Sequence, residues 1–87
     1  MLKAQSWLRR ADAILADEEF DVLVALSLVR EILYSAGLSS SLRIAAEQAE
    51  ISVQAANRSP ESKWQTAVAK QRLQMLRTTL AHAAFRA

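Results

Sequence analysis

Residues 20–36 read FDVLVALSLVREILYSA, a run in which apolar side chains recur on two opposite sides of a helix. At about 100° per residue, one broad side collects most of the valines, leucines and isoleucines, and an ordinary surface helix has only that one apolar side. The opposite side also carries large apolar residues, namely Phe20, Leu23, Val24 and Tyr34. This helix therefore needs cover on both sides, from its own bundle or from a partner.

Composition predicts one small helical domain spanning residues 1–87. A chain of 87 residues is large enough to bury roughly 60% of its unfolded surface without cross-links. It contains one glycine, one proline and 17 alanines, and alanine has the highest helix propensity. Cysteine is absent, which excludes disulfides and thiolate metal sites.

The first two helical segments are separated by acidic residues. Residues 2–16 have the spacing of a one-sided amphipathic helix. Asp17 is a candidate cap for a second helix, with acids in its first turn, and Gly37 is the natural left-handed residue at its end. A single continuous or kinked helix over residues 2–36 is an open alternative.

Two further helices follow. Residues 39–41 are serines that offer caps for a third helix, which runs to about Asn57. Ser59 as N-cap and Pro60 at the first helical position predict the start of a fourth, which runs to about Arg86. Its apolar residues alternate at spacings of four and three, which is typical of bundle packing: Ala69, Leu73, Leu76, Leu80 and Ala83. The sequence predicts an all-α antiparallel bundle of three to four helices with a long C-terminal helix.

Three of the four predicted helices carry a second apolar strip. Aromatic residues and methionine are enriched at the centres of protein interfaces, and two of the strips include such residues. We interpret this second set as a candidate partner interface, with internal burial in the bundle as the alternative. Its members are Phe20, Leu23, Val24, Tyr34, Ile44, Ile51, Trp64, Val68 and Met75.

The last helix is strongly basic and has no acidic residue from residue 63 onward. Lys63, Lys70 and Arg77 stand seven residues apart and form one basic stripe, which could follow a phosphate backbone. The alternative is a solvated face whose cations pair with acids of a neighbouring helix, such as Asp12. Neither a helix-turn-helix spacing nor a zinc-finger pattern accompanies the stripe.

The sequence shows no pattern typical of catalysis, cofactor binding or metal binding. There is no phosphate-binding glycine loop and no nucleophile elbow. The single histidine, His82, has no carboxylate near it in sequence, and no Glu-x-x-His pair is present. We therefore expect a protein that is not an enzyme and has no cofactor and no metal.

Location follows from the same patterns. The N-terminal residues lack the apolar core of a secretory signal, and the longest apolar run is shorter than the ~20 residues that span a bilayer. We expect a soluble, cytoplasmic protein that does not contact membranes.

The leading functional prediction is a small protein-interaction module: an adaptor, a chaperone-like accessory subunit or an inhibitor. It would bind through an apolar helix face to a second copy or to a heterologous helical partner. The alternative is a nucleic-acid-associated regulator that uses its basic C-terminal helix.

Overall fold

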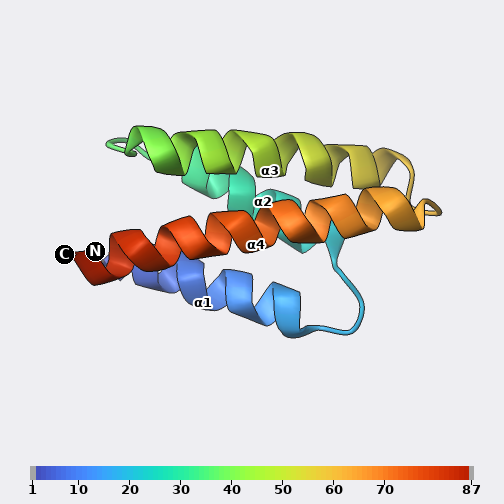
Figure 1. The fold of residues 1–87 in the computed structure, drawn as a ribbon, viewed down its shortest axis with the longest axis horizontal. Helices are drawn as coiled ribbons and strands as arrows, with labels where there is room; N and C mark the ends of the chain where they lie inside the picture. The colour runs from blue at the N-terminus through green and yellow to red at the C-terminus, as the bar shows by residue number, and fades with distance from the viewer. Residues whose placement is uncertain (1, 87) are drawn as a thin grey trace.

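The computed structural model describes the backbone of residues 2–86 and the side chains of residues 3–83. Four α-helices make up the described chain: α1 (Leu2–Ala16), α2 (Val22–Leu33), α3 (Ser40–Arg58) and α4 (Lys63–Arg86). Successive helices run in opposite directions, so α1 begins and α4 ends at the same end of the molecule (Figure 1). The predicted all-α antiparallel bundle with a long C-terminal helix is confirmed, and residues 2–36 form two helices.

The helices surround a shared core. α4 packs against both α3 and α1, whereas α2 packs mainly against α3 and has a smaller contact with α1. In Figure 1, α4 lies in front and α2 behind, with α3 above and α1 below. The outward sides of α2 and α4 therefore face opposite directions.

Every helix contributes buried apolar side chains to one core. Four of the five residues of the predicted seam of α4 are buried: Ala69, Leu73, Leu76 and Leu80 have no exposed surface, and Ala83 is half-buried. α3 contributes alanine at three of its five buried positions. Such small side chains let neighbouring helices approach closely, which explains why α3 packs extensively against α4.

The predicted start of the second helix at Asp17 is wrong, because α2 begins at Val22 with Asp21 as its N-cap. Asp21 Oδ1 accepts a hydrogen bond of 3.2 Å from the backbone N–H of Val24. The carboxylate of Asp17 instead accepts from the backbone N–H of Glu19 at 3.1 Å. This local turn competes with helix formation and leaves the acids of residues 17–19 in the connection.

The second helix also ends earlier than predicted, at Leu33 rather than beside Gly37. The backbone N–H of Ser35 donates to the carbonyl of Ile32 at 3.1 Å, a three-residue spacing that tightens the last turn and closes the helix. Gly37 does adopt the predicted left-handed conformation, with φ of 78°. It reverses the chain before Ser39, which caps α3 by accepting from the backbone N–H of Leu42, as predicted.

The predicted N-cap of the last helix at Ser59 is likewise wrong. The backbone N–H of Ser62 donates to the carbonyl of Ser59 at 3.0 Å, and this turn places Pro60 at its second position, where proline is favoured. Ser62 then caps α4, because its Oγ accepts from the backbone N–H of Gln65 at 3.2 Å. Proline thus belongs to the turn and not to the first turn of the helix.

None of the described helices combines the length and the apolar content needed to cross a bilayer.

Candidate functional site

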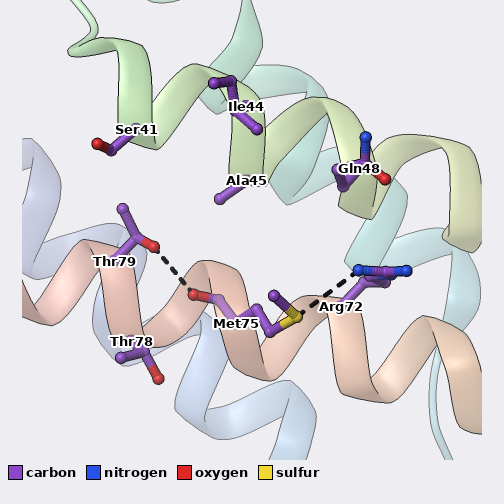
Figure 2. A pocket seen from close by; sticks show the side chains of 8 residues that line it. All are labelled: Ser41, Ile44, Ala45, Gln48, Arg72, Met75, Thr78 and Thr79. Atoms are coloured by element: carbon purple, nitrogen blue, oxygen red, sulfur yellow. Dashed lines mark hydrogen bonds between the residues drawn. The ribbon is translucent and has the colours of Figure 1, made fainter.

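A groove of about 370 Å³ runs between α3 and α4. Figure 2 shows its walls: Ser41, Ile44, Ala45 and Gln48 come from α3, and Arg72, Met75, Thr78 and Thr79 from α4. Ala45 points toward α4, and its short side chain leaves the space open. None of these eight residues carries a carboxylate. The groove is therefore lined by apolar and uncharged polar side chains and by one cation.

That cation is Arg72, which is half-buried beside Met75. Its Nη1 donates to the sulfur of Met75 at 3.8 Å (Figure 2), a contact to a weak acceptor. The ion pairs among the described side chains involve Arg10, Arg30 and Arg77 but not Arg72. The guanidinium therefore keeps hydrogen-bond donors available for a carboxylate brought by a partner.

The polar part of the α4 wall is internally satisfied. Thr79 Oγ1 donates to the backbone carbonyl of Met75 at 3.1 Å (Figure 2), and Thr78 Oγ1 donates to that of Gln74 at 3.1 Å. Because both hydroxyls are already used as donors, they offer a ligand mainly methyl groups and acceptor lone pairs. The groove wall is thus better suited to apolar side chains than to a strongly polar ligand.

The apolar surface continues along both helices beyond the groove. Ile51 lies two turns after Ile44 on the same side of α3, and both are well exposed. On α4, Trp64 and Val68 precede Met75 by eleven and seven residues, which places them along the same side of the helix. Trp64 is 69% exposed and Met75 51% exposed, so this strip is long, apolar and uncovered.

Seven of the nine residues predicted as a partner interface are exposed, and two are half-buried. The exposed residues are Leu23, Val24, Tyr34, Ile44, Ile51, Trp64 and Met75. Phe20 and Val68 are the half-buried pair, and Phe20 packs against the core. Their predicted role in binding a partner stays a prediction.

The structure does not bring the nine residues into one surface. Ile44 and Met75 meet in the groove between α3 and α4. Val24 lines a separate depression with residues of α1 and the first connection, and Tyr34 lines another with the start of α1. Two exposed surfaces result: a groove surface on α3 and α4, and an outward ridge along α2. The ridge has Leu23 near its start and Tyr34 at the C-cap, with the exposed Ser27 and Arg30 between them.

The basic stripe lies on the other side of α4 from the groove. Arg77 Nε donates to Asp12 Oδ1 of α1 at 2.7 Å, and this hydrogen bond, with the charge of Asp12, raises the pKa of Arg77 above its usual value. Lys63 is exposed and Lys70 half-buried. One of the three cations is thus paired within the bundle, and the interpretation of the stripe as a phosphate-binding surface stays a prediction.

Groups typical of catalytic or metal sites do not gather in the described part of the chain. Within residues 3–83, no three His, Asp or Glu side chains lie close enough to hold a metal ion. In the same range, no buried side-chain nitrogen or oxygen lacks a hydrogen-bond partner. The groove is therefore the most developed candidate site that these residues offer.

Sequence reasoning missed Arg72 as a groove residue. The signal was present, since Arg72 precedes Met75 by three residues and so shares its side of the helix. Among the lysines and arginines of residues 63–83, Arg72 is also the one that does not belong to the basic stripe of Lys63, Lys70 and Arg77.

Comparison with known proteins identifies no relative: no protein-family model matches the chain, and neither a curated protein nor a solved structure matches it significantly.

Proposed function

We propose that this chain is a non-enzymatic protein-interaction module whose α3–α4 groove binds the apolar face of a helix. The observation that carries the proposal is the uncovered apolar strip beside the groove, which includes Ile44, Ile51, Trp64 and Met75. Extended apolar patches on small proteins mark sites of association, and methionine and tryptophan are frequent in interface centres.

The shape of this surface supports a helix as the bound element. The strip follows two antiparallel helices (Figure 1). Ile44 and Ile51 stand seven residues apart on α3, and Trp64 and Met75 stand eleven residues apart on α4. A third helix that lies between two others presents side chains at the matching spacing of three and four residues. A compact small molecule would fill the groove but would leave Ile51 and Trp64 uncovered.

Such a module acts by adding a helix to its bundle. The adaptor, accessory-subunit and inhibitor roles all use this one binding mode and differ only in what the bound helix belongs to. Large exposed side chains contribute about 1.5–3 kcal/mol each on full burial, before the cost of association is subtracted. Four such side chains supply enough for a complex of moderate affinity.

Methyl NMR with a defined peptide tests the proposal. The probe is a synthetic amphipathic helix with a leucine ridge, compared with a scrambled peptide of the same composition. The four isoleucines form a built-in control, because Ile44 and Ile51 are exposed near the groove whereas Ile14 and Ile32 are buried in the core. We expect the peptide to shift the methyl signals of the first pair and to leave the second pair unchanged.

A matched pair of variants completes the experiment. Met75→Asp should abolish the shifts, whereas Gln74→Asp adds the same charge one residue away, outside the groove, and should preserve them. Equal shifts with the scrambled peptide, or no shifts with the amphipathic one, would overturn the proposed function.

A further inference from the structure

We infer that the helix bound in the α3–α4 groove is α2 of a second copy of this chain, which inserts its outward ridge. The inference rests on the proposed function and names the partner of the same groove. It derives from the presence, on one molecule, of an uncovered apolar groove and of a helix ridge with large exposed apolar side chains, Leu23 and Tyr34, at its two ends.

The ridge on α2 has the features of a bound helix. Leu23 in the first turn of α2 is 66% exposed, and Tyr34, the residue that caps its C-terminus, is 85% exposed. They stand eleven residues apart, or three turns, and so on one side. Trp64 and Met75 on the groove surface are separated by the same eleven residues. At 1.5 Å per residue both pairs span about 16 Å, so the ridge and the strip match in length.

Charge favours the same pairing. The segment just before the ridge carries Asp17, Glu18, Glu19 and Asp21, and none of these acids takes part in an ion pair among the described side chains. The groove itself carries one cation, Arg72, which also takes part in none of these ion pairs, whereas Lys63, Lys70 and Arg77 lie on the other side of α4. An acidic segment brought beside Arg72 gains from their attraction, which also aligns the two molecules during encounter.

The contact must form between molecules. α2 lies on the opposite side of the bundle from α4 (Figure 1), so a molecule cannot insert its ridge into its own groove. Because ridge and groove are different surfaces, each bound copy still presents one free groove and one free ridge. Such head-to-tail contacts build rings or open chains, in contrast to a two-fold dimer that uses one surface twice.

Complementation between two variants tests this arrangement by sedimentation velocity. Met75→Asp damages the groove and keeps the ridge, whereas Leu23→Asp damages the ridge and keeps the groove. Wild-type protein should form species larger than a dimer as its concentration rises. Each variant alone should sediment as a single 9.6 kDa chain, and their equimolar mixture should form a dimer and nothing larger, because only one competent groove and one competent ridge remain.

Two controls separate the contact from a general effect of charge. Gln74→Asp, outside both surfaces, should self-associate like the wild type. Replacing the acids beside the ridge, Glu18→Gln with Glu19→Gln, should weaken self-association, and added salt should weaken it as well.

The outcomes are distinct. The inference is overturned if the wild type is monomeric at every concentration, if the mixture of variants stays monomeric, or if Leu23→Asp still dimerises, which would indicate a two-fold contact through the groove. A monomeric wild type whose Ile44 and Ile51 methyl signals respond to the amphipathic peptide would leave the proposed function standing and refute only the identity of the partner.

Discussion

Trp7 Nε1 and Arg10 Nη1 of α1 both donate to Oε2 of Glu31 on α2, each at 2.8 Å. The indole is buried, whereas the carboxylate is half-exposed. Because α1 and α2 share the smaller of the helix contacts, these hydrogen bonds are an important part of what joins them. The pKa of Glu31 is lowered mainly by the hydrogen bond from Arg10 and next by that from Trp7.

The lowered pKa of Glu31 makes stability depend on acidity. Its contribution is complete above the usual value of 4.5 and is lost as the pH falls through the lower folded pKa. We expect this loss to amount to at most about 1 kcal/mol, because solvent screens a half-exposed pair. Urea unfolding at a series of pH values should show a flatter acid limb for Glu31→Gln than for the wild type.

An acid elsewhere serves as the reference for that measurement. Glu47 is exposed and takes part in none of the ion pairs among the described side chains. Glu47→Gln should therefore follow the wild-type dependence on pH. If Glu31→Gln followed it equally closely, the ionisation of Glu31 would contribute no stability.

Adjacent residues of α4 should differ sharply in their effect on stability. Leu76 is fully buried, and Leu76→Ala should cost about 2–5 kcal/mol of unfolding free energy because it leaves a cavity. Met75 is half-exposed in the groove, and Met75→Ala should change stability by about 0.5 kcal/mol or less. Urea denaturation of both variants checks this, and similar losses would mean that the groove is part of the core.

Glycine should be required at position 37 because of its left-handed backbone conformation, and not because a Cβ would clash with neighbouring atoms. Its φ is 78°, and nothing lies within 4 Å of where a Cβ would stand. Gly37→Ala should cost about 1–2 kcal/mol of unfolding free energy from left-handed strain. Gly37→Asn should cost less, because asparagine tolerates this conformation. Thermal unfolding of the two variants gives the order, and equal stability of all three proteins would contradict it.

Composition and helix periodicity were enough to predict the fold class. The spacing of Leu73, Leu76 and Leu80 places them on one side of a helix, and that side is buried. The same reasoning found the second apolar strips, because a residue such as Ile51 cannot point into the core when its neighbours Ala49 and Val53 do. Faces of single helices are thus readable from one sequence.

The site depended on information that helix periodicity does not contain. Ile44 and Met75 meet only because α3 and α4 are neighbours with a particular rotation about their axes. The same pattern would have allowed Tyr34 or Leu23 to join them, and the placement of α2 behind the bundle prevents it. The sequence therefore predicted most of the exposed apolar side chains, but the prediction treated residues of two separate surfaces as one interface.

Helix boundaries were missed where two residues could serve as the cap. Asp17 and Asp21 both suit an N-cap, as do Ser59 and Ser62. In each case the later residue, Asp21 or Ser62, caps the helix, because the earlier residue forms a local turn. The turn at Asp17 uses its carboxylate and the turn at Ser59 its backbone carbonyl, and the residue types alone do not specify which of the two candidates forms the turn and which the cap.

The choice between Ser59 and Ser62 can be measured directly. Ser62 Oγ accepts from the backbone N–H of Gln65, so Ser62→Ala should cost about 1 kcal/mol of unfolding free energy, the usual effect of losing an N-cap. Ser59 contributes its backbone carbonyl to the turn, and Ser59→Ala should cost no more than about 0.5 kcal/mol, as for an ordinary surface substitution.

Ser39→Ala provides the reference, because Ser39 caps α3 in the same way, and this variant should lose as much unfolding free energy as Ser62→Ala. Urea unfolding of the three variants decides the matter. A larger loss for Ser59→Ala than for Ser62→Ala would move the start of α4 back to the turn and leave Pro60 at its first helical position.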